Sequence, residues 1–128
     1  MTWEGKGMEG LPDEILRLDM KRYCLALDLK DDPQLIAEYE FWHRNVWPEI
    51  RKSLVDAGIT EMQIYRLGNR LVMIMETDSS FSFERKEAMD KANPKVQEWE
   101  ALMWKFQKPL PGTPVGEKWV LMDKIFEL

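Results

Sequence analysis

The stretch Glu38–Ile50, EYEFWHRNVWPEI, contains the only histidine of the chain, His43. Residues four apart on an α-helix lie above one another on the same face, so Tyr39, His43 and Trp47 form a single stripe. Pro48 lacks an N–H and would break the interior of a helix. The stretch therefore predicts one helix that ends shortly before Pro48 and a second helix that begins there.

The stripe of three rings has two interpretations. An imidazole has an ordinary pKa near 6.5, so it both gives and takes protons near neutral pH, which makes His43 a candidate general acid or base. Alternatively, Tyr39, His43 and Trp47 form the buried face of an ordinary amphipathic helix. The residues alone leave both interpretations open.

Toward the N-terminus, the pattern changes to an alternation typical of a strand. From Met20, one face carries four apolar side chains, namely Tyr23, Leu25, Leu27 and Leu29. Asp31-Asp32-Pro33 then supplies an N-cap candidate and a proline for the first helical position, so we expect a helix from there to about Asn45. Residues 1–19 hold three glycines and little periodicity, so we predict an N-terminal extension followed by a single domain over residues 20–128.

Toward the C-terminus, strands are predicted at Ile59–Arg66 and Leu71–Thr77, with Gly68-Asn69 as the turn of a hairpin. A helix is expected over Ser80–Ala92, and a second one begins after Asn93. That second helix has a stripe of residues expected to be buried: Val96, Trp99, Met103 and Phe106. After a proline-rich loop, residues 119–128 are apolar on both faces and predict a closing strand.

The order strand, helix, strand, strand, helix, strand indicates an α+β fold, specifically a ferredoxin-like βαββαβ domain with a four-stranded antiparallel sheet. Helices then cover one face of the sheet and leave the other open. Because apolar residues on an open face need a cover, we expect a homodimer in a dimeric α+β barrel arrangement.

Composition excludes several classes of function. A net charge of -5 argues against a nucleic-acid surface, and no stretch of about 20 apolar residues suggests a membrane span. One histidine and one cysteine cannot form a His/Cys metal cluster, and no glycine-rich phosphate loop stands between a strand and a helix. We therefore expect no metal, no cofactor, no nucleic-acid or membrane partner, and a cytoplasmic location.

The spacing Tyr-x-x-x-His-x-x-x-Trp-Pro-Glu, which runs from Tyr39 to Glu49, resembles the signature of the L-rhamnose mutarotase family. The likeness extends from about Lys21 to Leu128 and includes Ile64-Tyr65, Gln97-Glu98-Trp99 and the closing segment with Phe126. It implies a ferredoxin-like dimer and a cofactor-free enzyme that interconverts the α and β anomers of a 6-deoxyhexose.

The resemblance also implies roles for single residues. His43 would be the general acid that donates to the ring oxygen, while Tyr39 or Tyr65 orients the anomeric hydroxyl. Trp99 or Trp47 would pack on the C–H face of the sugar. Trp99 is followed by Glu100, where rhamnose enzymes tend to carry a second tryptophan, so both L-rhamnose and L-fucose stay open as substrates.

Two other functions fit the same order of elements. One is a cofactor-free monooxygenase of the dimeric α+β barrel type, which would consume oxygen with an oxidisable substrate. The other is a non-enzymatic module in which Tyr39 and His43 only line a small-ligand pocket. Fold alone does not separate these functions, whereas catalysed exchange between sugar anomers does.

Overall fold

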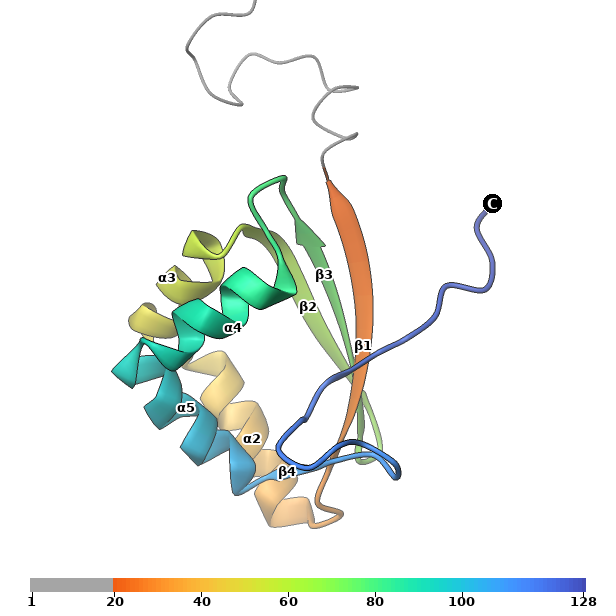
Figure 1. Cartoon of the computed structure of the whole chain (residues 1–128). Helices are drawn as coiled ribbons and strands as arrows, with labels where there is room; N and C mark the ends of the chain where they lie inside the picture. The colour runs from red at the N-terminus through yellow and green to blue at the C-terminus, as the bar shows by residue number, and fades with distance from the viewer. Residues whose placement is uncertain (1–19) are drawn as a thin grey trace, which may run out of the picture.

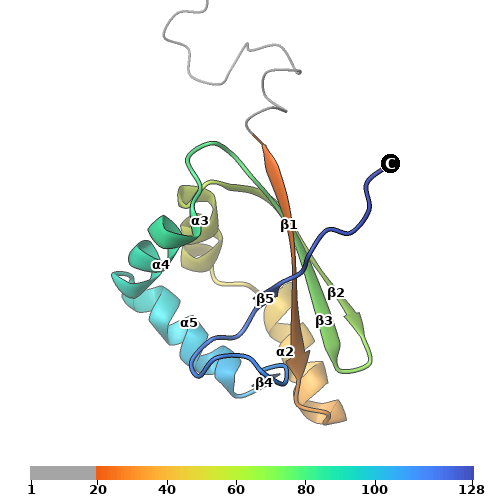
Figure 2. The same cartoon turned by 45° about the vertical axis from the view of Figure 1, so that its right-hand side comes forward.

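Helices lie on one face of an antiparallel sheet, and the opposite face is uncovered (Figure 1). The computed structural model describes residues 20–128, so the N-terminal extension expected over residues 1–19 lies outside the described range. The same layered arrangement is visible after a turn of 45° (Figure 2). The α+β architecture and the helices on a single face are as the sequence predicts.

The strands of the sheet follow the order β2-β3-β1-β4, in which β4 is the two-residue strand Gln107–Lys108. Strand β1 (Lys21–Leu29) pairs antiparallel with β3 (Arg70–Thr77), which pairs on its other side with β2 (Ile59–Leu67). Gly68 closes the β2–β3 hairpin with φ +59°, a left-handed conformation that glycine adopts without steric cost. The predicted hairpin and its turn are confirmed.

Two of the helices begin at the predicted caps, Asp32 and Asn93, whereas the helix expected from Ser80 begins at Phe83 with Ser82 as its cap. The helices are α2 (Pro33–Arg44), α3 (Pro48–Asp56), α4 (Phe83–Lys91) and α5 (Pro94–Trp104). The side chains of Asp32, Ser82 and Asn93 each accept hydrogen bonds from backbone N–H groups of the first turn of α2, α4 and α5, respectively. None of these helices is long and apolar enough to cross a membrane.

The break between α2 and α3 falls where Pro48 requires it. Asn45 ends α2 by donating its backbone N–H to the Trp42 carbonyl oxygen at 3.1 Å. Trp47, with an extended backbone, is the N-cap of α3, and Pro48 occupies its first turn. The predicted break directly after His43 is therefore confirmed.

The core lies between the helices and the sheet. The stripe predicted on α5 is buried, with Val96, Trp99, Met103 and Phe106 all less than a tenth exposed. Leu29 of β1 and Tyr39 of α2 complete the same cluster. Tyr39 is only 3% exposed and is packed among the apolar side chains of this cluster.

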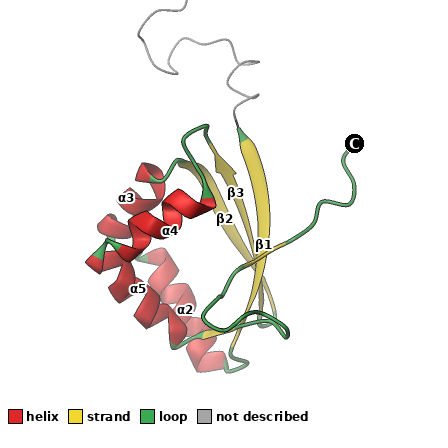
Figure 3. Cartoon of the chain, in the orientation of Figure 1, coloured by secondary structure: helices red, strands yellow, loops and turns green. Residues whose placement is uncertain are grey.

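The predicted closing strand at residues 119–128 is wrong for most of its length. Only β5 (Val120–Leu121) forms there, opposite Ala26 and Leu25 of β1, while β4 (Gln107–Lys108) pairs with the other end of β1. Residues 122–128 run past the sheet without regular structure (Figure 3). An alternating pattern forms a strand only where a partner edge supplies hydrogen bonds, and the last such bond runs from the Met122 N–H to the Cys24 carbonyl oxygen.

Candidate functional site

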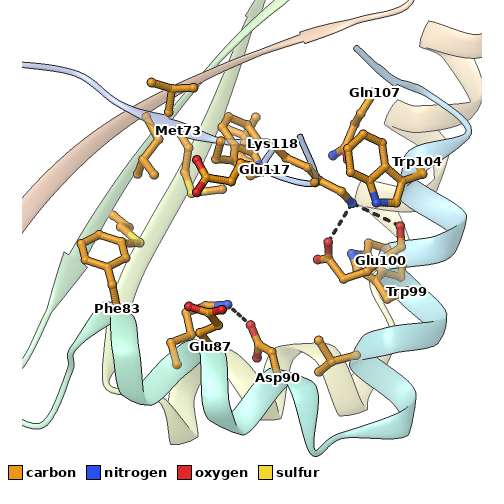
Figure 4. A pocket seen from close by; sticks show the side chains of 18 of the residues that line it. Met73, Phe83, Glu87, Asp90, Trp99, Glu100, Trp104, Gln107, Glu117 and Lys118 are labelled. Carbon is orange, nitrogen blue, oxygen red and sulfur yellow. Dashed lines mark hydrogen bonds and ion pairs between the residues drawn. The ribbon is translucent and has the colours of Figure 1, made fainter. Parts of the chain in front are cut away.

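A cavity of about 970 Å³ opens between the helices and the covered face of the sheet. This volume is at the upper end of the usual range for ligand pockets, roughly 300–1,000 Å³. One end is apolar and is lined by Leu25, Met62, Ile64, Met73, Met75 and Phe83. The other end combines aromatic and polar side chains, and Figure 4 shows both ends facing the same space.

Tyr39 and His43 lie next to each other at the polar end. Their ring centroids are 4.2 Å apart with an interplanar angle of 32°. The Nδ1 atom of His43 is 2.8 Å from the Tyr39 carbonyl oxygen. Because a carbonyl oxygen only accepts, this bond places the proton of the neutral imidazole on Nδ1 and leaves Nε2 with a free lone pair.

Burial shifts the pKa values of the His43 imidazole and the Tyr39 phenol. It lowers the pKa of His43 from 6.5, although the bond to the Tyr39 carbonyl opposes the shift. Burial also raises the pKa of Tyr39 to about 12, with the nearby Gln107 amide lowering it and the charge of Glu100 raising it further. At neutral pH the site therefore holds an uncharged imidazole and an uncharged phenol.

Two tryptophans extend this aromatic end. Trp99 lines the cavity, and its ring lies edge-on to His43 at a centroid distance of 5.8 Å. Trp47 packs against Trp99 at 5.1 Å, also edge-to-face, but does not itself line the cavity. The structure thus brings together four of the five residues singled out from the sequence, with Trp47 behind Trp99.

The fifth residue, Tyr65, lies elsewhere. Successive side chains of a strand point to opposite faces of a sheet, so Tyr65 points away from the side of its neighbour Ile64, which lines the cavity. Its side chain is on the uncovered face and 60% exposed. Within one chain, Tyr65 does not reach the space in front of His43.

Sequence reasoning missed most of the polar wall that faces His43. Lys118 donates to Glu100 at 2.7 Å from the carboxylate and 3.2 Å from the backbone oxygen, and its Nζ lies 4.5 Å from the centroid of Trp104. Gln107 and Thr113 line the same wall. Only Glu100 could be suspected from the sequence, because no local pattern indicates that residues 107–118 fold back onto the cavity.

This is a small α+β domain in which one imidazole and one phenol face a cavity wide enough for a small molecule. Such a pair is suited to moving protons on a hydroxylated ligand. Residues 22–128 match the family model described as L-rhamnose mutarotase. The chain belongs to the L-rhamnose mutarotase family.

Relatives of this chain are named as mutarotases of two different sugars, L-fucose and L-rhamnose. An L-fucose mutarotase from Xanthomonas campestris pathovar campestris is 51% identical over 87% of this chain and 90% of the relative. An L-rhamnose mutarotase from Phocaeicola vulgatus is 37% identical over 62% of this chain and 73% of the relative. The crystal structure of an L-rhamnose mutarotase from Formosa agariphila has a TM-score of 0.62 at 20% identity, covers 84% of this chain and 98% of its own, and supports the fold.

Proposed function

We propose that this chain interconverts the α and β anomers of L-fucose. Family membership makes it a sugar mutarotase for 6-deoxyhexoses, so the open questions are the sugar and the residues. The observation that favours L-fucose is the 51% identity to the Xanthomonas enzyme over nearly the whole of both chains. Glu100, in place of a second aromatic ring, adds a charged acceptor suited to a sugar hydroxyl.

Mutarotation needs only the movement of two protons. In the mechanism we propose, Nε2 of His43 takes the proton of the anomeric hydroxyl, whose O–H electrons form the C1=O bond. The bond between C1 and the ring oxygen breaks, and the ring oxygen receives the phenolic proton of Tyr39. Rotation about C1–C2 presents the other face of the aldehyde, and the ring closes as both protons return.

This assignment gives His43 the role of base. The resemblance implied the opposite role, a general acid that donates to the ring oxygen. Two features support the reversal: Nδ1 is engaged by the Tyr39 carbonyl oxygen, and burial lowers the pKa of His43 so that the neutral form prevails. A positioned base of this kind typically contributes about 10²- to 10⁴-fold to a rate.

Trp99 provides the packing surface for the sugar. Its ring borders the cavity beside His43, and Trp47 fixes it from behind. The C–H face of the hexose would lie on this indole. Tyr65 has no part in this arrangement, because it lies on the opposite face of the sheet.

The working unit is a homodimer formed through the uncovered face of the sheet. No helix between residues 20 and 128 covers that face, and the C-terminal segment that leaves it carries exposed apolar residues, among them Ile125, Phe126 and Leu128. Exposed apolar side chains in such number favour association. A second copy would cover both the face and the segment.

Proton NMR saturation transfer tests the reaction and the sugar together. The exchange between anomers is measured with L-fucose and, separately, with L-rhamnose, with and without a catalytic amount of protein. We expect enhanced exchange with both sugars and a larger enhancement with L-fucose. A preference for L-rhamnose would contradict the assignment of the sugar, and no enhancement with either would leave the monooxygenase and binding-module functions.

A further inference from the structure

Two buried side-chain oxygens between residues 20 and 128 have no hydrogen-bond partner: Oε1 of Gln107 and Oγ1 of Thr113. Both residues line the same cavity. Buried polar atoms in folded proteins are nearly always paired, because a lost hydrogen bond to water is otherwise not replaced. Two unpaired oxygens on residues that line one cavity therefore point to a partner that enters it.

The backbone holds both residues firmly in this wall. Gln107 lies in β4, directly after the fully buried Phe106, and pairs with Leu29 of β1. Its side chain is only 5% exposed. Thr113 follows Gly112, whose φ of +84° turns the chain, and donates its backbone N–H to the Leu110 carbonyl oxygen at 3.1 Å.

The chemistry of the two groups describes the missing partner. An amide oxygen accepts hydrogen bonds, and a threonine hydroxyl both donates and accepts, but neither carries charge. The Gln107 amide also lies close enough to the Tyr39 phenol to stabilise its ionised form. A neutral polyol whose reacting carbon faces His43 and Tyr39 would place its other hydroxyls against this wall.

We propose that Gln107 and Thr113 determine sugar specificity by hydrogen bonding to ring hydroxyls remote from the anomeric carbon, a role that depends on the proposed function. L-Fucose and L-rhamnose differ in configuration at C2 and C4. The amide oxygen of Gln107 and the hydroxyl of Thr113 would distinguish the two sugars, because a sugar hydroxyl in the wrong configuration leaves these buried oxygens unpaired. Discrimination by such groups is stronger than discrimination by apolar packing.

The test combines protein variants with substrate analogues. Gln107→Met and Thr113→Val keep side-chain size and remove the hydrogen-bonding groups, while Gln34→Met makes the same change on the exposed first turn of α2. Exchange is measured with L-fucose and with its 2-, 3- and 4-deoxy analogues. We expect each cavity variant to lose about 5- to 100-fold in kcat/KM for L-fucose, as for an unpaired buried group, and Gln34→Met to lose nothing.

The decisive readout is the pattern across the analogues. If Gln107 binds one hydroxyl, the loss caused by Gln107→Met disappears for the analogue that lacks this hydroxyl and persists for the others. A merely structural role gives the same loss with every analogue and overturns the assignment. Full activity of both variants also overturns it, since the unpaired oxygens would then bind only water.

Thermal stability gives an independent check. Because Oγ1 of Thr113 has no partner in the free protein, Thr113→Val should leave the melting temperature unchanged or raise it. A marked drop for Thr113→Val, or a failure to fold, would mean that this hydroxyl is paired within the protein and would contradict the inference. If the unsubstituted protein does not catalyse exchange with any of these sugars, the proposed function fails first, and this role fails with it.

Discussion

At the scale of single residues, the proposed mechanism depends on the hydrogen bond between His43 Nδ1 and the Tyr39 carbonyl oxygen. It orients the imidazole, selects one tautomer and leaves Nε2 free toward the cavity. The helical spacing of four residues alone produces this bond, since the acceptor is the backbone of the residue one turn earlier. In the proposed mechanism, a single helix thus supplies the base, its orienting group and the phenol.

The pH dependence of exchange distinguishes a base from an acid. Burial lowers the pKa of His43 below 6.5. If neutral His43 is the base, exchange is full at pH 7 to 8 and falls as the pH drops through that lowered pKa. Initial rates of L-fucose exchange between about pH 4.5 and 8 measure this decrease at low pH. A rate that instead rises as the pH falls would identify imidazolium as the acid, the role implied by the resemblance.

The variant His43→Asn shows whether His43 causes this pH dependence of the exchange rate. The asparagine amide can still donate to the Tyr39 carbonyl oxygen but has no group in the place of Nε2. We expect exchange to fall about 10²- to 10⁴-fold, with a circular dichroism spectrum like that of the unsubstituted protein. The remaining rate should no longer decrease at low pH, and retention of the decrease would assign the titration to another group.

At the scale of elements, the joint between α3 and β2 fixes how the helices sit on the sheet. Gly58 has φ +97°, donates its N–H to the Val55 carbonyl oxygen and accepts from the Asp78 N–H. Arg85 adds two bonds to the same joint, to the carbonyl oxygens of Ala57 and Asp56, both at 3.1 Å. The joint therefore ties α3, α4 and the ends of two strands together.

Substitution of Gly58 tests how tightly this joint is packed. A Cβ there would lie 2.6 Å from both Asp78 Oδ1 and Ser80 Oγ, whereas nothing lies within 4 Å of a Cβ at Gly68, which also has positive φ. Gly68→Ala should cost about 1–2 kcal/mol for the left-handed backbone. Gly58→Ala should cost roughly 1–3 kcal/mol more, because it overpacks the joint. Urea denaturation of both variants measures the difference, and equal losses would mean that the joint has room.

Local signals were sufficient to predict most elements. Asp32 and Asn93 cap α2 and α5, Pro48 separates α2 from α3, and Gly68 closes the hairpin, each through its own chemistry. The pairing of Tyr39 with His43 was predictable for the same reason, since the two are one turn apart on α2, whereas Trp47 lies beyond the end of that helix, as the N-cap of α3, and does not continue the predicted stripe. These features need no knowledge of distant contacts.

The remaining features depend on contacts between distant residues. Tyr65 was assigned to the site by resemblance, although the alternation of β2 directs it to the other face. The role of Gln107 is visible only because its buried oxygen has no partner. The strand predicted for residues 119–128 failed beyond Leu121, because the segment leaves the edge of β1 after the hydrogen bond from the Met122 N–H to the Cys24 carbonyl oxygen.

At the scale of the whole molecule, helices cover one face of the sheet, and the C-terminal segment extends past the other (Figure 2). Truncation after Asp123 removes Ile125, Phe126 and Leu128, which are three-quarters or more exposed. If a second copy buries them, the truncated protein should dissociate at concentrations where the full chain sediments as a dimer.

Sedimentation velocity over a range of concentrations measures this change. Val115→Asp is the control, because Val115 is equally exposed but lies in the loop between β4 and β5, and this variant should stay dimeric. The cavity is built from residues of one chain, so a truncated monomer that still exchanges L-fucose anomers would show that the second copy stabilises the fold without contributing to catalysis. A full chain that sediments as a monomer at all concentrations would refute the dimer.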